Sequence, residues 1–369
     1  MRVRITGWCL LLLLPISGLA SDNWAPGKKL DAWFDALAAQ GRVNGSIAIS
    51  ENGRMRYQRS LGFARIENGV AQPADAGTRY RIGSVSRLVT AVLTLQLAET
   101  ASITLDTPVA EFYPDLPNAL AITYRDLLQE RSGLADYFDA PDFPAWRTQP
   151  RTHGQLLAAI IAPGPKFEPR ERTEYSHSNA LLLGFMIEKV RGRPYGEILS
   201  RGIERLGLVR TYFAGTQVSS LESLAYEATA TSWVAIPPSD PSVLGGAAGV
   251  VSNAGDLVQL MDALFAGKLV SAQSLDTLRN PDAPIALLPK RISGEPGTGL
   301  EGGGDGFSAA VYHFPERRLS IAITSNATTM PVGEIIGQAM SILPRGRRSH
   351  GQAGSITDAP VVLRASRSR

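Results

Sequence analysis

Apolar residues recur at helical spacing near both ends of the chain, each time beside a stretch that alternates like a strand. Residues 27–41 (GKKLDAWFDALAAQG) place apolar side chains on one face and end at a glycine, which predicts an amphipathic helix. Residues 45–69 alternate around the turn ENG and predict a β-hairpin. Near the other end, residues 306–326 predict a second hairpin that turns at PERR, and residues 331–343 predict a closing helix.

The middle of the chain is mostly helical in its pattern. Residues 84–105 form a long apolar run that predicts a helix beginning at Ser84, and residues 117–240 alternate between helices and proline-rich loops. Residues 253–271 predict another helix, with Asn253 or Asp256 near its start. Because helix and hairpin occupy both ends, this order predicts an α+β fold, with an antiparallel sheet from both chain ends and inserted helices.

The first twenty residues have the composition of a targeting segment. Arg2 and Arg4 precede an apolar run, and small residues follow up to Ala20, which predicts a signal peptide over 1–20 that is cleaved near Ala20. The run is too short to cross a membrane, so no transmembrane anchor is expected. Cys9 would leave with this segment, and the mature chain would then have no disulfide. We expect an exported bacterial protein, periplasmic or secreted.

Charge divides the chain into a body and a tail. The formal net charge is +3, of which the signal arginines supply two units and residues 345–369 supply five, leaving about −4 for residues 21–344. A mildly acidic body argues against a nucleic-acid partner. We therefore expect one domain over 21–344 and a disordered basic tail over 345–369.

The sequence carries no pattern typical of a metal or a bound cofactor. No glycine-rich phosphate loop follows a strand, and no two histidines have the spacing of metal ligands. The four histidines are scattered along the chain, at His153, His177, His313 and His350. We therefore expect neither a metal nor a cofactor.

Three separate stretches carry candidate chemistry. Ser84 lies where the long helix should begin, and the helix macrodipole there would stabilise an oxyanion. Tyr175 and His177 come just before another helical pattern. A glutamate and a run of glycines lie on a strand, where glycines let backbone approach a ligand closely. The candidate site residues are Ser84, Arg87, Tyr175, His177, Glu301, Gly302 and Gly303.

In this order the three stretches resemble the motifs of the penicillin-recognising serine hydrolases, which include class C type β-lactamases, D-Ala-D-Ala carboxypeptidases and related esterases. Residues 126–137 (DLLQERSGLADY) and the glycine-rich residues 244–271 are similar to two further segments of that family. The resemblance covers roughly 30–340. It implies a β-lactamase/transpeptidase-like fold, a site between the sheet and a mainly helical lobe, and Ser84 as the nucleophile.

Each motif departs from the family pattern at a chemically important position. The first is Ser-x-x-Lys in the family, whose lysine helps to take the serine proton, whereas this chain has Arg87, which cannot give up its own proton. The second is usually Tyr-x-Asn and here ends in His177. The third usually begins with a cation or histidine and here begins with Glu301. The departures put the family's proton transfer and its binding of substrate carboxylates in doubt.

Three hypotheses account for the substituted residues. In the first, Tyr175 is the base and Arg87 favours its anion by opposite charge. In the second, Ser84, His177 and Glu301 form a serine–histidine–acid relay. In the third, Glu301 pairs with Arg87 and fills the cleft. All three expect Ser84, Arg87, Tyr175 and Glu301 to line one cleft, with the Ser84 and Tyr175 hydroxyls within about two hydrogen-bond lengths.

Two functions remain open at the level of the sequence. One is an exported serine hydrolase that acts through Ser84 on neutral esters or amides rather than β-lactams, since Glu301 would repel a substrate carboxylate. The other is a catalytically inactive relative whose cleft binds a small-molecule or cell-wall-derived ligand, or a partner. Neither specifies an oligomeric state.

Overall fold

The computed structural model describes residues 24–345 except 216, 230–231, 281–285 and 328–329. The predicted signal peptide and all but the first residue of the predicted tail lie outside the described residues. No helix in the described part combines the length and apolar character needed to cross a membrane.

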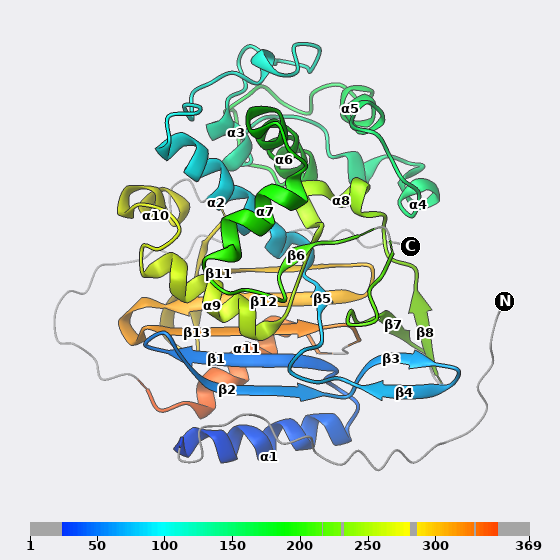
Figure 1. Cartoon of the computed structure of the whole chain (residues 1–369), viewed down its shortest axis with the longest axis vertical. Helices are drawn as coiled ribbons and strands as arrows, with labels where there is room; N and C mark the ends of the chain where they lie inside the picture. Colours follow the sequence, from blue (N-terminus) through cyan, green and yellow to red (C-terminus); the bar gives the residue numbers. More distant parts are fainter. Residues whose placement is uncertain (1–23, 216, 230–231, 281–285, 328–329, 346–369) are drawn as a thin grey trace.

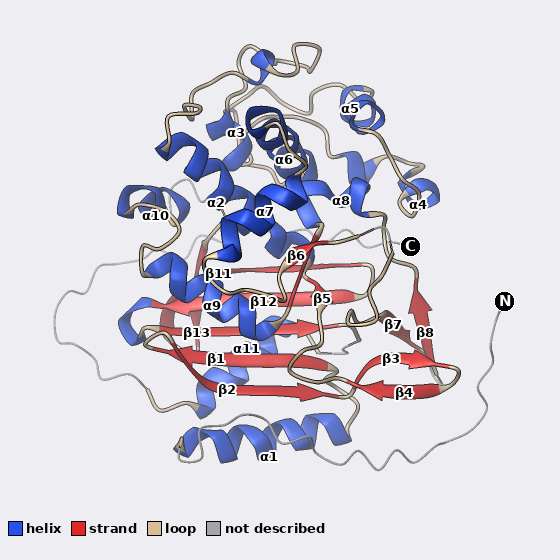
Figure 2. Cartoon of the chain, in the orientation of Figure 1, coloured by secondary structure: helices blue, strands red, loops and turns tan. Residues whose placement is uncertain are grey.

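A six-stranded antiparallel sheet forms the base of the molecule and joins the two ends of the chain (Figure 2). β1 pairs with β13 so that Gly45 lies opposite Ser325, which confirms the expected α+β fold. The six strands, in spatial order, are β10 (Leu288–Ile292), β11 (Glu295–Gly304), β12 (Phe307–Phe314), β13 (Leu319–Ser325), β1 (Gly45–Glu51) and β2 (Arg54–Leu61).

Helices cover both faces of this sheet (Figure 1). The outer face packs on α1 (Ala25–Ala39) and α11 (Val332–Ile342), the two predicted terminal helices, in one hydrophobic cluster. The inner face packs on α9 (Ala254–Phe265), whose N-cap is Asn253: the Asn253 side chain accepts a hydrogen bond from the Asp256 amide at 2.8 Å. Asp256 therefore lies inside the first turn rather than at the cap.

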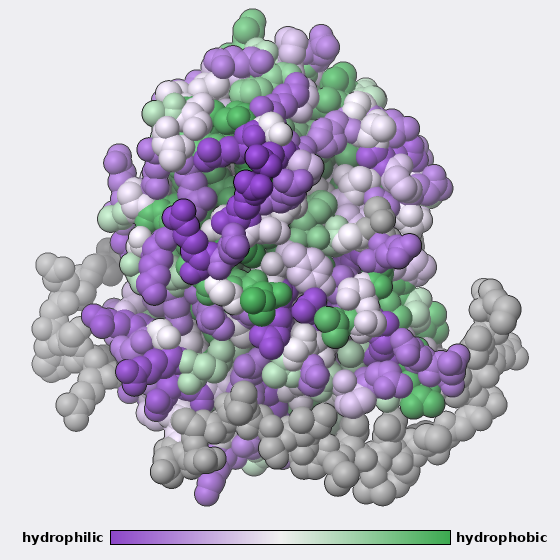
Figure 3. Space-filling view, viewed as in Figure 1, coloured by the Kyte–Doolittle hydropathy of each residue, from purple (hydrophilic) through white to green (hydrophobic). Residues whose placement is uncertain are grey.

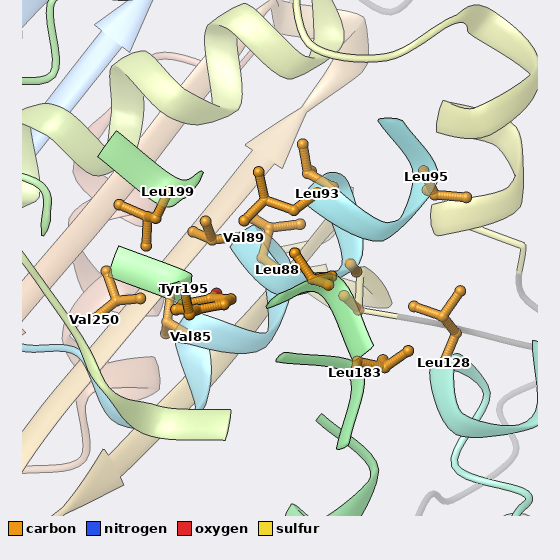
Figure 4. Close-up of a cluster of buried hydrophobic side chains, with 14 of the residues drawn as sticks. Val85, Leu88, Val89, Leu93, Leu95, Leu128, Leu183, Tyr195, Leu199 and Val250 are labelled. Atoms are coloured by element: carbon orange, nitrogen blue, oxygen red, sulfur yellow. The ribbon is translucent and has the colours of Figure 1, made fainter. Parts of the chain in front are cut away.

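A mainly helical lobe lies above the inner face (Figure 1). Its central helix α2 (Ser86–Glu99) is buried nearly all round, as its continuous apolar sequence requires. Figure 4 shows Leu88 and Leu93 of α2 beside Leu183 and Tyr195 from neighbouring helices. The other helices of this region are α3 (Tyr124–Leu128), α4 (Phe143–Trp146), α5 (His153–Ile161), α6 (His177–Arg191), α7 (Tyr195–Glu204), α8 (Pro241–Ala248) and α10 (Ala272–Leu278).

In the described part of the chain, short strands form small sheets beside the main one, and apart from β3, which lies within the predicted hairpin stretch 45–69, the sequence pattern did not predict them. β9 pairs with β5 and β6 in a small sheet of two- and three-residue strands. The predicted helical middle of the chain thus also contains strands. The short strands are β3 (Phe63–Glu67), β4 (Val70–Pro73), β5 (Tyr80–Arg81), β6 (Tyr212–Phe213), β7 (Ala225–Ala228), β8 (Trp233–Ile236) and β9 (Val250–Ser252).

Hydrophobic residues on the face viewed in Figure 3 form small groups separated by hydrophilic ones. Exposed apolar side chains occur singly along the chain, for example Leu120 and Val209. Such scattered exposure is ordinary for a folded surface and marks no site by itself.

Candidate active site

Ser84 lies in a sharp turn between a strand and a helix. β5 pairs with β9, and the Ile82 amide donates to Val250 O at 3.1 Å, which fixes the chain just before the turn. A 3-10 turn over Gly83–Val85 follows, and α2 begins at Ser86, two residues later than predicted. Gly83 has φ of +52°, a conformation that glycine adopts without strain. The turn holds the Ser84 side chain half-buried at the start of the helix.

β11 passes directly against this turn, and glycine makes that approach possible. A β-carbon on Gly302 would lie 2.7 Å from the Ser84 amide nitrogen and 2.6 Å from that of Val85. A β-carbon on Gly83 would in turn lie 2.8 Å from the Gly303 nitrogen. The glycines of the third stretch therefore border Ser84.

Tyr175 is the partner of Ser84. The Ser84 Oγ and the Tyr175 hydroxyl lie 2.8 Å apart, one hydrogen-bond length, although the residues are 91 apart in sequence. Tyr175 precedes α6, and the extended conformation of Ser176 (φ −148°, ψ 126°) directs Tyr175 and His177 to the same side of the chain.

Arg87 is paired within the lobe and not with the sheet. Its Nη2 lies 2.5 Å from Glu130 Oε1, and its guanidinium carbon lies 4.5 Å from the centre of the Tyr175 ring. Glu130 also accepts hydrogen bonds from the Ser176 amide at 3.1 Å and from Asn179 Nδ2 at 2.5 Å. Burial disfavours the charged guanidinium, but the effects of Glu130 and Tyr175 together outweigh burial and raise the pKa of Arg87. Arg87 is therefore a permanent cation. Burial raises the pKa of Glu130 above its ordinary value, but Arg87 and the hydrogen bonds from Asn179 and the Ser176 amide favour the carboxylate, so we take Glu130 as the counterion.

The Tyr175 hydroxyl keeps its proton at neutral pH. Burial raises the pKa of Tyr175 above its ordinary value, and the opposing effects of Arg87 and of the hydrogen bond to Ser84 are smaller. The direction is the reverse of the one that the first hypothesis requires, because burial outweighs the charge of Arg87, and the carboxylates of Glu130 and Asp136 act in the same direction as burial. A resting phenolate base is thus not available.

His177 begins α6 and is oriented by Asp136. Its Nδ1 lies 2.8 Å from Asp136 Oδ2, and its amide donates to the same oxygen at 3.1 Å. Burial acts to raise the pKa of Asp136, but its hydrogen bond and charge interaction with His177, together with the amides of Phe138 and His177, hold it below the usual value. Asp136 is therefore an ionised acceptor, and Nδ1 of His177 is the donor.

Glu301 points away from the cleft. Its carboxylate binds Lys290 Nζ at 2.5 Å and the Tyr312 hydroxyl at 2.6 Å, and it lies beside Gly333 of α11. Side chains alternate along a strand, so the contact of Gly302 with Ser84 places Glu301 on the opposite face of β11. The predicted relay through Glu301 and the predicted Arg87–Glu301 salt bridge are both wrong, and Glu301 does not line the cleft.

The sequence analysis missed Glu130 and Asp136. Both lie in the stretch 126–137, which it compared with the family segment without assigning a role to any side chain. The available signal was Glu130, two residues before Ser132, because Glu130 and Arg131 stand where the family segment has a histidine and a threonine. Among the described residues, no group of three or more His, Cys, Asp or Glu side chains is arranged to hold a metal ion.

Comparison with curated proteins gives a partial match. Teichoic acid D-alanine hydrolase of Staphylococcus aureus is 29% identical over 170 residues, which cover 46% of this chain and 40% of that protein. The matched segment thus spans about two fifths of the length of this relative.

Solved structures match over most of the chain. The D-stereospecific amidohydrolase from Streptomyces sp. has a TM-score of 0.69 and 28% identity, covering 81% of this chain and 94% of that one. The D-amino acid amidase from Ochrobactrum anthropi SV3 has a TM-score of 0.76, covers 85% of this chain and 97% of that one, and at 22% identity shows the shared fold alone. The family model described as Beta-lactamase matches residues 30–339. The fold is therefore β-lactamase/transpeptidase-like, as the resemblance implied, and the chain belongs to the Beta-lactamase family.

Proposed function

We propose that the protein is a serine hydrolase that cleaves esters or amides of D-amino acids through an acyl-enzyme on Ser84. The observation that carries the proposal is the 2.8 Å contact between the Ser84 and Tyr175 hydroxyls, at a turn bordered by β11. The substrate class is supported by the names of two relatives, a D-alanine hydrolase and a D-stereospecific amidohydrolase.

Acylation needs a route for the serine proton, and Arg87 cannot supply it. Tyr175 can do so without ionising first. As Ser84 Oγ bonds to the substrate carbonyl carbon, its proton passes to the Tyr175 oxygen. Tyr175 passes its own proton to the leaving alcohol or amine as the scissile bond breaks. The Arg87–Glu130 pair holds the phenol ring in place during this exchange.

Labelling with a fluorophosphonate probe tests the nucleophile. We expect the probe to modify Ser84 in the wild type and to leave Ser84→Ala unlabelled. Ser200→Ala is the matched control, because Ser200 is exposed on α7 and its hydroxyl donates to Gly196 O of the same helix at 2.9 Å. The p-nitroanilides of D- and L-alanine then test the substrate class, with the D form expected to be cleaved faster.

A wild type that is neither labelled nor active would support the second candidate function, a non-catalytic protein whose cleft binds a small-molecule or cell-wall-derived ligand. The buried Arg87–Glu130 pair is the observation that favours this alternative, since it replaces a removable proton by a fixed charge.

Export is also part of the proposal. It is supported by the arginines, apolar run and small residues of 1–20. N-terminal sequencing of the protein recovered from the outer compartments of an expressing bacterium tests it. A mature chain that begins near Ser21 is expected, and an intact Met1 start would contradict it.

A further inference from the structure

The His177–Asp136 pair is a prepared proton acceptor that the acylation step does not use. The Nδ1 proton of His177 is committed to Asp136 at 2.8 Å. In the neutral imidazole the lone pair then lies on Nε2. The His177 side chain keeps 18% of its surface exposed, whereas Asp136 keeps 8%. The acid is therefore enclosed while the imidazole remains accessible.

The imidazole is also fixed in orientation. Its ring stacks on Phe138 with centroids 3.8 Å apart and an interplanar angle of 10°. Asp136 in turn accepts from the Phe138 amide at 3.0 Å, so one short turn supplies both the acid and the stacking ring. The contacts with Phe138 and Asp136 fix the orientation of the imidazole before the reaction, so less rotational entropy is lost in the transition state.

The imidazole lies beside the group that touches Ser84. The rings of Tyr175 and His177 meet edge to face, with centroids 4.9 Å apart, and the Tyr175 hydroxyl contacts Ser84 Oγ. Among the described residues no direct hydrogen bond joins His177 to Ser84 or Tyr175. The geometry thus suits a base that acts on a water molecule near the Ser84 oxygen rather than on the serine itself.

We propose that His177, positioned by Asp136, is the general base that activates water to hydrolyse the acyl group on Ser84. This inference rests on the proposed acyl-enzyme. The water oxygen bonds to the acyl carbon while one water proton moves to Nε2. The bond between Ser84 Oγ and the acyl carbon then breaks, and Ser84 takes the Tyr175 proton. The proton that His177 took from water then passes to the Tyr175 oxygen by way of a further water molecule, so the enzyme is regenerated and one carboxylic acid is released.

Pre-steady-state hydrolysis of p-nitrophenyl acetate separates the two half-reactions. In His177→Gln we expect the first equivalent of p-nitrophenol to form at close to the wild-type rate, while steady-state turnover falls about 10²-fold or more, as for loss of a general base. Acetylated Ser84 should accumulate and be detected by mass spectrometry of the peptide. Asp136→Asn should shift the kinetics in the same direction. His153→Gln is the matched control, because His153 also contacts a carboxylate, Glu188 at 3.3 Å, but lies outside the site.

Chemical rescue distinguishes a base from a structural side chain. In His177→Ala, added imidazole should restore turnover of the accumulated acyl-enzyme. Unchanged steady-state turnover in His177→Gln, or loss of the first p-nitrophenol equivalent together with turnover, would overturn the inference. A lack of rescue in an otherwise acylated His177→Ala protein would also overturn it. If the wild type never forms acetyl-Ser84, the proposed function itself fails.

Discussion

Where the related enzymes have a lysine that can lose its proton, this chain has Arg87, which forms an ion pair with Glu130 beside the nucleophile. The pair is nearly closed to solvent, with side-chain exposures of 16% and 8%. Glu130 has φ of +56°, a left-handed conformation that is unusual for a residue with a β-carbon. The chain thus maintains local backbone strain where it places the counterion of Arg87, which indicates that the two residues act as a unit.

A double-mutant cycle of Arg87→Lys and Glu130→Gln tests this unit. Lysine alone should stay protonated, because the Glu130 carboxylate raises its pKa, so esterase activity should change little. Glu130→Gln alone leaves a buried cation unpaired and should cost about 3–5 kcal/mol in the free energy of unfolding. The double variant should gain p-nitrophenyl butyrate hydrolysis beyond the sum of the single changes.

Each variant of that cycle needs Ser84→Ala in the same background, to subtract reaction at other surface groups. Purely additive effects, or a gain that survives Ser84→Ala, would show that the Arg87–Glu130 pair does not control the nucleophile. Urea unfolding of the four proteins separates a change in activity from a loss of folded protein.

At the scale of elements, β11 sets what can stand beside Ser84. Leu300 and Gly302 share the face of β11 that contacts the lobe, and Leu300 is buried in the lobe's hydrophobic cluster. Glu301 faces α11 and has its own cation, Lys290. The expectation that Glu301 repels a substrate carboxylate is therefore wrong. β11 nevertheless presents no cation on the face that borders Ser84, so it offers no partner to such a carboxylate.

Nitrocefin hydrolysis is expected to be negligible for that reason. A β-lactam carboxylate would find no positive side chain from β11, and Arg87 is already paired with Glu130. We expect turnover well below ~1 per second, the lower range of working enzymes. Hydrolysis of p-nitrophenyl butyrate by the same preparation is the positive control. Nitrocefin turnover at or above ~1 per second would refute the inference that β11 offers no cation to a substrate carboxylate.

Gly302→Ala should disable Ser84 without touching its side chain. The added carbon would lie 2.6 Å from the Val85 nitrogen, 2.7 Å from the Ser84 nitrogen and 2.9 Å from the Ile82 oxygen, and all three are backbone atoms that cannot rotate away. We expect fluorophosphonate labelling to fall by ~10-fold or more, because a misplacement of about 1 Å near a reacting group can cost 10²-fold.

Gly337→Ala provides the control for this change. Gly337 lies in α11, and an added β-carbon there meets no atom within 4 Å. Labelling should be unchanged, and the free energy of unfolding should rise by roughly 0.5–1 kcal/mol. Equal labelling of both alanine variants would mean that β11 is not tightly apposed to the Ser84 turn.

At the scale of the whole molecule, a series of side-chain hydrogen bonds joins helix α9 to the inner face of the main sheet. Ser320 Oγ in β13 donates to Asp262 Oδ1 of α9 at 2.6 Å and accepts from His313 Nδ1 at 2.9 Å. Phe265 stacks on the His313 ring with centroids 3.9 Å apart. Burial lowers the pKa of His313 to about 4.

Because of His313, the free energy of unfolding should decrease as the pH is lowered. Because the folded pKa lies below the unfolded value of about 6.5, the unfolded chain binds the proton first, and stability is lost as pH falls from about 6.5 towards 4. At ~1.4 kcal/mol per pKa unit, the 2.5-unit difference corresponds to at most about 3.5 kcal/mol. His313→Asn should lack this component when urea unfolding is compared with the wild type across that range. Parallel pH dependences of the two proteins would contradict it.

The sequence predicted the elements that have a local pattern of apolar residues. It did not predict contacts between residues that are far apart in the chain. The hairpins and terminal helices have periodic apolar positions, so they were found. β5 and β9 have two and three residues, too few to show a period, and exist only because they pair across the fold. The order of the motifs likewise predicted four site residues, Ser84, Arg87, Tyr175 and His177. The roles of Glu130 and Asp136 depend on the directions of side chains in the folded protein, which the motif order does not give.

The pairing of β1 with β13 has a consequence for synthesis. Its partner β13 comes last in the sheet, and the hydrogen bond from Ser325 Oγ to Asn44 O joins residues 281 apart in sequence. At 5–20 residues per second, roughly 15–55 s pass between the emergence of these two residues from the ribosome. During that interval the apolar edge of β1 has no native partner. A growing chain therefore cannot complete its sheet before β13 has been made, and a product that stops before Leu319 lacks the strand that pairs with both β1 and β12.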